Sequence, residues 1–311
     1  MNIKNTILSG AVVTAAALAP FSVNAAEVKK IGLAVPNLSA NYFIQIQESV
    51  EEYGESLGIE VITVNANNDS ATQVSQVQDL LTQNIDAFIY IPAGAAAATV
   101  PTRLARAQGI PVVNVDRNAE GEPGDTFIAG EGVKSAYEVC SHLIGLADGK
   151  GEMLMVHGQK GVTPEVNRTK GCMQAIDENE GVTLVGQQWS ERWSQDEGFS
   201  ITQNLLQANP NVNIIFGQAD GLAMGASKAA AASGSSQEIF VGGYDGDTGA
   251  LLALRDGVFD VTATQSTRTM GRLAVDSAIK IAAGEEVPAE QIIDAVLTTQ
   301  ENVEQFIEDH P

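Results

Sequence analysis

The sequence predicts an α/β protein with two doubly wound, parallel-sheet lobes. Strand-length apolar runs alternate with helix-length segments almost without a break. The strands are continuous apolar runs, which suits parallel strands covered on both faces. This series of alternating strands and helices occurs twice, and each copy contains a late strand that ends in aspartate, in "VVNVDR" and "VGGYDG". The length of 311 residues also suits two domains better than one.

The first series lies within residues 30–116. Helices are predicted over 41–58, 71–84 and 95–109, with Asp69-Ser70 as the cap of the second one. Helix-length connections are what parallel strands require. The strands are "KIGLAVP" (30–36), "IEVITVNA" (59–66), "IDAFIYIP" (85–92) and "IPVVNVD" (110–116).

The second series begins near Glu131. Its predicted helices are 132–147, 165–179, 195–209 and 221–234, and its predicted strands are 151–158, 182–189, 212–220 and 238–247. A last helix over 270–284 and the segment 292–298 are expected to cross back to the first lobe. The predicted boundaries are a signal peptide over 1–25, a first lobe over 26–130 plus 266–294, and a second lobe over 131–265 plus 295–311.

The N-terminus has the pattern of a secretory signal peptide. Lys4 gives a positive start, an apolar run over 6–21 follows, and Val23 and Ala25 are the small residues before a cleavage site. Cleavage is expected between Ala25 and Ala26, with an N-terminal membrane anchor as the alternative. The sequence therefore predicts a soluble periplasmic protein.

The composition disfavours several functional classes. With 17 Lys and Arg against 39 Asp and Glu, the net charge is -22, which disfavours nucleic acid and anionic membranes as partners. His142, His157 and His310 do not have metal-ligand spacing. There is no Walker A motif, no G-x-S-x-G elbow and no G-x-G-x-x-G after a strand. We expect a protein that is not an enzyme and has no cofactor and no metal.

The two cysteines, Cys140 and Cys172, both fall in helical patterns of the second lobe. In an oxidising compartment they can form a disulfide. The alternative is two separate buried thiols, each acting as a small hydrophobe. Both interpretations remain open from the sequence.

Candidate binding residues lie where strands end, because open α/β sheets bind ligands outside the carboxyl ends of their strands. Aspartate accepts hydroxyl hydrogen bonds, arginine donates from a planar fork, and an aromatic face suits the C–H side of a sugar. The candidates are Tyr42, Phe43, Asp116, Arg117, Arg168, Trp193, Asp245 and Gln265. The structural alternatives are an apolar helix start for Tyr42 and Phe43, a solvated ion pair for Asp116 and Arg117, a surface helix position for Arg168, and an N-cap for Asp245.

Four motifs give the chain a family resemblance. They are "IPVVNVDR", "NRTKGCMQAI", "FSITQNLLQANPNVNIIFGQADGLAMGA" and "VGGYDGDTGALLALRDG". In this order and spacing, over roughly 27–298, the chain resembles the ribose-binding-like, type I periplasmic binding proteins of sugar ABC importers. The resemblance implies two Rossmann-like lobes that are joined by a three-strand hinge and close on one sugar.

The resemblance also assigns roles to the candidates. It implies that Tyr42 and Phe43 sandwich the sugar ring with Trp193, and that the polar contacts come from Asp116, Arg117, Arg168, Asp245 and Gln265. Where ribose binders carry asparagine, this chain has Ala40, Ile91 and Ala219, and Pro36 replaces a hydroxyl residue. Either Asn41 or Asp220, one residue away, compensates, or the ligand presents fewer hydroxyls there. Asn41 and Ala219 complete the predicted lining.

Two arginines and two aspartates in one cleft predict a neutral ligand, a monosaccharide or polyol, with ribose not the best one. The predicted function is the binding subunit of an ABC importer, a monomer that partners a membrane permease. The alternative is a periplasmic receptor for a furanose-like signal, either an autoinducer or a chemotaxis ligand.

Overall fold

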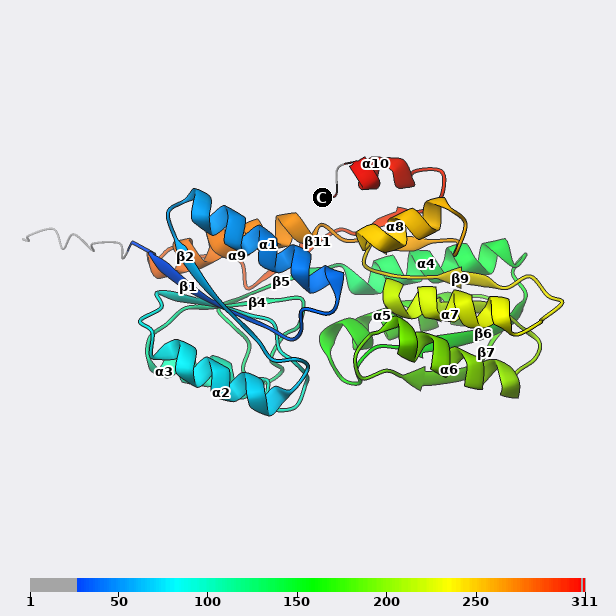
Figure 1. Cartoon of the computed structure of the whole chain (residues 1–311), viewed down its shortest axis with the longest axis horizontal. Helices are drawn as coiled ribbons and strands as arrows, with labels where there is room; N and C mark the ends of the chain where they lie inside the picture. Colours follow the sequence, from blue (N-terminus) through cyan, green and yellow to red (C-terminus); the bar gives the residue numbers. More distant parts are fainter. Residues whose placement is uncertain (1–26, 309, 311) are drawn as a thin grey trace, which may run out of the picture.

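The computed structural model describes residues 27–308 and 310, and these form two lobes that lie side by side along the longest axis of the molecule (Figure 1). The predicted signal peptide and its cleavage site lie outside the described residues. No helix in the described part of the chain is long and apolar enough to span a bilayer.

The first lobe is built on a six-stranded parallel sheet in the order β11-β5-β4-β3-β1-β2. Its strands are β1 (Lys30–Val35), β2 (Glu60–Asn65), β3 (Ala87–Tyr90), β4 (Val112–Val115), β5 (Thr126–Gly130) and β11 (Glu290–Ile293). Its helices are α1 (Asn41–Ser56), α2 (Ser70–Leu81), α3 (Thr99–Ala107) and α9 (Thr267–Ala282). The pair α1 and α9 covers one face, and α2 and α3 cover the other (Figure 1).

The second lobe is built on a four-stranded parallel sheet in the order β7-β6-β8-β9. Its strands are β6 (Gly151–His157), β7 (Val182–Trp189), β8 (Val212–Gly217) and β9 (Phe240–Gly242), and beside them β10 (Thr262–Thr264) and β12 (Val296–Thr298) form an antiparallel pair. Its helices are α4 (Gly132–Leu146), α5 (Thr163–Asp177), α6 (Gln195–Ala208), α7 (Asp220–Ala232), α8 (Thr248–Arg255) and α10 (Val303–Glu308). The predicted fold class, two doubly wound lobes, is confirmed.

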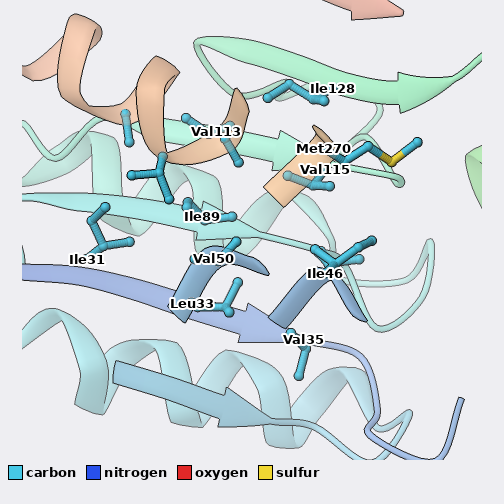
Figure 2. Close-up of a cluster of buried hydrophobic side chains, with 14 of the residues drawn as sticks. Ile31, Leu33, Val35, Ile46, Val50, Ile89, Val113, Val115, Ile128 and Met270 are labelled. Atoms are coloured by element: carbon cyan, nitrogen blue, oxygen red, sulfur yellow. The ribbon is translucent and has the colours of Figure 1, made fainter. Parts of the chain in front are cut away.

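The core of the first lobe explains why α1 forms and where it packs. Ile46 and Val50 are four residues apart, so they lie on one face of the helix. Figure 2 shows them beside Leu33 of β1 and Met270 of α9 in one cluster of buried side chains. All four are fully buried, and burying each such side chain contributes about 1.5–3 kcal/mol. This packing holds the N-terminus of α1 at the edge of the sheet that faces the second lobe.

The chain passes between the lobes three times: between β5 and α4, between β10 and α9, and between β11 and β12. The segment 292–298, expected to cross back to the first lobe with a lobe boundary between residues 294 and 295, is divided between the lobes. Its first part belongs to β11 and pairs with β5, while its second part forms β12 and pairs with β10.

The third helix begins later than predicted, at Thr99 rather than at residue 95. Pro101 lacks a backbone N–H, so it fits the first turn of a helix but not its interior. Ala97 has a φ of 60°, which a right-handed helix does not allow. The alanines before Thr99 therefore form turns.

In the second lobe, Cys140 of α4 and Cys172 of α5 are joined by a disulfide, with their Cα atoms 5.3 Å apart. Both residues are fully buried between the two helices and the sheet. Of the two interpretations that the sequence left open, the structure contains the bonded one.

Candidate functional site

A cavity of about 310 Å³ lies between the lobes. It is near the lower end of the ~300–1,000 Å³ range of small-molecule sites. Its walls are the segments that follow β1, β4, β7, β8 and β9, together with two residues of α5, Pro164 and Arg168. Among the predicted site residues, those that line it are Asn41, Tyr42, Phe43, Asp116, Arg117, Arg168, Trp193, Ala219 and Asp245.

Asp116 and Arg117, which follow β4, form a buried pair. Their side chains are 5% and 2% exposed, and Arg117 Nε lies 3.5 Å from Asp116 Oδ2. A solvated surface ion pair is therefore not what the structure contains. Arg117 Nη1 donates to the carbonyl oxygens of Pro92 and Ala93 at 3.0 and 3.2 Å. It also donates to Gln159 Oε1 of the second lobe at 3.2 Å, so this arginine spans the cleft.

Arg168 and Asp245 form the matching pair in the second lobe. Arg168 Nη2 lies 3.0 Å from Asp245 Oδ1, and its guanidinium stacks 3.8 Å from the centre of the Tyr244 ring. Burial alone would lower the pKa of Arg168, but the nearby Asp245 carboxylate helps to raise it. Burial raises the pKa of Asp245 well above its usual range, and Arg168 opposes that shift. Asp245 does not cap the following helix, since the N-cap of α8 is Asp247.

Gln265 lies behind the lining rather than on it. It donates from Nε2 to Asp245 Oδ1 at 3.0 Å and accepts from the Tyr42 hydroxyl at 3.4 Å. The single proton of that hydroxyl is shared with Asp116 Oδ1, which lies 3.1 Å from the Tyr42 oxygen. Gln265 therefore connects the aspartates of the two lobes, and it acts on the cavity through them.

The aromatic residues frame the two arginines. The Arg117 guanidinium lies 5.2 Å from the Phe43 ring centre and 5.9 Å from that of Trp193. The centre of the Trp193 ring also lies 5.7 Å from the Arg168 guanidinium carbon, and Trp193 is 9% exposed. Tyr42 and Phe43 belong to the hydrophobic core of the first lobe as well, so the apolar helix start and the cavity wall are the same residues.

A family model described as a periplasmic binding protein domain matches residues 31–286 of this chain. The chain belongs to the periplasmic binding protein family. The ribose import binding protein RbsB of Bacillus subtilis is 32% identical over 258 residues, which cover 83% of each chain. The fold and the sequence motifs therefore lead to the same family as the comparison does.

Solved structures of similar proteins share this fold. An ABC transporter solute binding protein from Bacillus halodurans with bound myo-inositol is 28% identical, has a TM-score of 0.84, and the match covers 91% of this chain and 98% of that one. One from Actinobacillus succinogenes with bound D-allose is 25% identical, has a TM-score of 0.82, and the match covers 89% and 99%. Both are named as binding proteins.

Three apolar residues of this periplasmic binding protein were expected at places where ribose binders carry asparagine, but only two of them line the cavity. Ala40 and Ala219 line the cavity. Ile91 does not, because it is fully buried in the core of the first lobe. Asp220, considered as a compensating group, is also fully buried, and it accepts from the backbone N–H groups of Gly246 and Asp247 at 2.7 and 2.9 Å.

The sequence interpretation missed several cavity residues, among them Pro164, Met224, Ala250 and Asp247. The first three are ordinary helix residues, and only the packing of the lobes brings them to the cavity. Asp247 could have been predicted from the sequence, since it stands two residues after Asp245 in the segment "VGGYDGDTG". It adds a third acidic side chain to a lining expected to hold two.

Proposed function

We propose that this chain is the solute-binding subunit of an ABC importer, and that it holds one small polyhydroxylated molecule, a neutral monosaccharide or polyol, between its two lobes. The observation that carries the proposal is the paired arrangement of Asp116 with Arg117 and of Arg168 with Asp245 on opposite walls of one cavity. Each pair offers both donors and acceptors, which is what a sugar hydroxyl can use.

The size and the walls of the cavity favour a single ring. About 310 Å³ is little space for an oligosaccharide. Phe43 and Trp193 provide apolar faces beside the two arginines. The named relatives support the class: one imports ribose by its name, and two solved structures hold myo-inositol and D-allose. Ala40 and Ala219 lack amide side chains, so ribose is not the expected best ligand.

The proposed working cycle needs no catalysis. The protein collects its ligand outside the inner membrane, after removal of residues 1–25, and delivers it as a monomer to a membrane permease. We propose the periplasm as its compartment on the N-terminal pattern and on the family. N-terminal sequencing of exported protein is expected to return Ala26, and a sequence beginning at Met1 would contradict export with cleavage.

A thermal-shift screen tests the ligand class. The panel contains pentoses, hexoses, linear polyols and inositols, with sugar phosphates and sugar acids as the charged comparison. A ligand at 100–1,000 times its dissociation constant stabilises the folded protein by about 3–4 kcal/mol. We expect a neutral member to give the largest shift among these classes. A sugar phosphate or sugar acid in first place would contradict the proposal.

A further inference from the structure

The loop between β9 and α8 brings a third acidic side chain, Asp247, to the cavity wall. Asp247 occupies the N-cap position of α8, yet its side chain makes no capping hydrogen bond. Its carboxylate is therefore not committed to the helix. Its Oδ1 atom is buried without a hydrogen-bond partner, and the neighbouring polar side chain is that of Asn41 in the first lobe.

The charges of the cavity do not balance once Asp247 is included. Arg117 is paired with Asp116, and Arg168 with Asp245. Within residues 27–308 and 310, no cationic group lies within ion-pair distance of Asp247. Arg192 also reaches the lining, but its side chain is 66% exposed and faces Glu197 at 3.7 Å. Burial raises the pKa of Asp247 to about 6, and Arg168 opposes that shift only in part. Since Arg168 makes its ion pair with Asp245, Asp247 has no ion-pair partner of its own in the described part of the chain.

The position of Asp247 is fixed by a buried support. Asp220 accepts hydrogen bonds from the backbone N–H groups of Gly246 and Asp247, and from the Thr262 hydroxyl at 2.6 Å. Asp220 is fully buried and does not line the cavity. The backbone that carries Asp247 is thus held at the cavity wall by an anchored turn.

We infer that Asp247, beside Asn41, forms a subsite for a protonated amino group, so that the protein takes amino-substituted polyols such as amino sugars and aminocyclitols in addition to neutral ones. This inference rests on the proposed function, because it concerns one substituent of a ligand that the same cavity holds. An ammonium group supplies both the missing cation and N–H donors for the unpartnered oxygen.

The physical reason for a preference over the matching hydroxyl compound is the charge. A hydroxyl donates one hydrogen bond to the carboxylate, but it leaves the negative charge uncompensated in a partly desolvated site. A hydroxyl and an ammonium both make a charge-assisted hydrogen bond with the carboxylate, but only the ammonium adds the attraction between opposite charges, which is stronger in a partly desolvated site than in water. We therefore expect the amino compound to bind about ten- to a hundredfold more tightly than its hydroxyl counterpart.

Matched ligand pairs test the inference by titration calorimetry near neutral pH. The probes are D-glucose with D-glucosamine, D-galactose with D-galactosamine, and myo-inositol with an amino-deoxy inositol. Asp247→Asn keeps the size of the side chain and removes its charge. Asp177→Asn is the matched control, because it removes one exposed carboxylate from α5 outside the cavity. Thermal unfolding of each variant checks that the fold is kept.

We expect at least one amino compound to bind more tightly than its partner. We also expect Asp247→Asn to abolish that preference, and Asp177→Asn to preserve it. Binding of neutral members alone would overturn this inference and leave the proposed function standing. The same preference in Asp247→Asn would also overturn it. If no member of any pair bound, this inference would be overturned, and the thermal-shift screen with pentoses and linear polyols would decide the proposed ligand class separately.

Discussion

Three side chains of the cavity wall stand on backbone with positive φ. The angles are 59° at Asp116, 58° at Trp193 and 121° at Asp245. Such conformations cost about 1–3 kcal/mol each for residues other than glycine, and they collect at functional sites. The residue types were predictable from the sequence, because charged groups that end apolar strands indicate a site. The strained backbone was not, since no local pattern marks it.

Asp116→Asn is expected to weaken ligand binding by about tenfold or more, because the variant loses the charge that strengthens hydrogen bonds from a ligand hydroxyl. Asparagine tolerates the positive φ at this position, so the fold should persist. Titration calorimetry with the best ligand of the screen measures the effect. Asp79→Asn, on the exposed side of α2, is the control. Unchanged affinity in Asp116→Asn would remove Asp116 from the proposed site.

The buried Asp220 predicts how stability depends on pH. Burial raises the pKa of Asp220 to about 8, whereas an aspartate in the unfolded chain titrates near about 3.9. Between these values the folded protein binds more protons than the unfolded chain. The contribution of protonated Asp220 to the free energy of unfolding is therefore fully present below about pH 4 and is lost as pH rises through about 8.

Urea unfolding at about pH 5 and about pH 8 measures this dependence. We expect a larger free energy of unfolding at the lower pH. Asp220→Asn resembles the protonated form, since its amide can accept from the Gly246 and Asp247 N–H groups and donate to Thr262. In this variant the difference between the two pH values should shrink. An unchanged difference would mean that other groups cause it.

Helix pairs in the second lobe approach closely at glycines. A Cβ atom on Gly171 of α5 would lie within 2.0 Å of the Val133 carbonyl oxygen of α4. The same holds for α6 and α7, where a Cβ on Gly225 would lie 2.2 Å from the Gln195 carbonyl oxygen. Apolar periodicity in the sequence predicted these helices. It did not predict that the glycines are contact points, because the periodicity of one helix carries no information about the helix that packs against it.

Two short strands, β5 and β10, escaped prediction for a related reason. The strands β5 and β10 have five and three residues and lie beside glycine, aspartate and threonine, so they carry little apolar pattern. They are specified by pairing with distant strands, β5 with β11 and β10 with β12. Long helices and buried strands were predictable since each carries its own periodicity.

Gly171→Ala is expected to destabilise the second lobe by about 1–3 kcal/mol, because the added methyl group meets backbone that cannot move aside without separating α4 from α5. Gly145→Ala is the matched control: it lies in α4, and apart from its chain neighbours and the backbone of its own helix no atom lies within 4 Å of the place that its added methyl group would take. There the substitution should stabilise the helix by about 0.5–1 kcal/mol. Denaturant unfolding compares the two variants, and equal effects would contradict the close contact.

The disulfide between Cys140 and Cys172 closes a segment with a sequence separation of 32. A loop of this length is expected to contribute about 3–4 kcal/mol through the unfolded state. The double variant Cys140→Ala, Cys172→Ala should lose this amount together with a smaller packing effect. Exported wild-type protein should show no free thiol under denaturing, non-reducing conditions. Two free thiols per chain would rule the bond out.

The order of the elements predicts two lobes, but it does not predict how close the two lobes lie to each other. Two βα series predict two sheets, and strand ends predict the edge where a ligand binds. The distance between these edges depends on hydrogen bonds between residues far apart in the chain. Gln45 of α1 donates to Thr248 of α8 at 3.2 Å, and the Asn118 N–H donates to the Thr163 hydroxyl at 3.0 Å. With the Arg117–Gln159 bond, these contacts join the lobes across the cleft.

Gln159→Ala is expected to weaken ligand binding several-fold although Gln159 does not line the cavity. The variant loses the bond from Arg117 and with it part of the free energy that favours the closed arrangement, so a ligand must supply that part itself. The free energy of unfolding should change little, because each lobe keeps its own core. Gln78→Ala, on the exposed face of α2, is the control. Small-angle scattering with saturating ligand should show wild type and both variants equally compact, whereas without ligand Gln159→Ala should be the most extended. Equal affinity and equal compactness without ligand would show that this contact does not hold the lobes together.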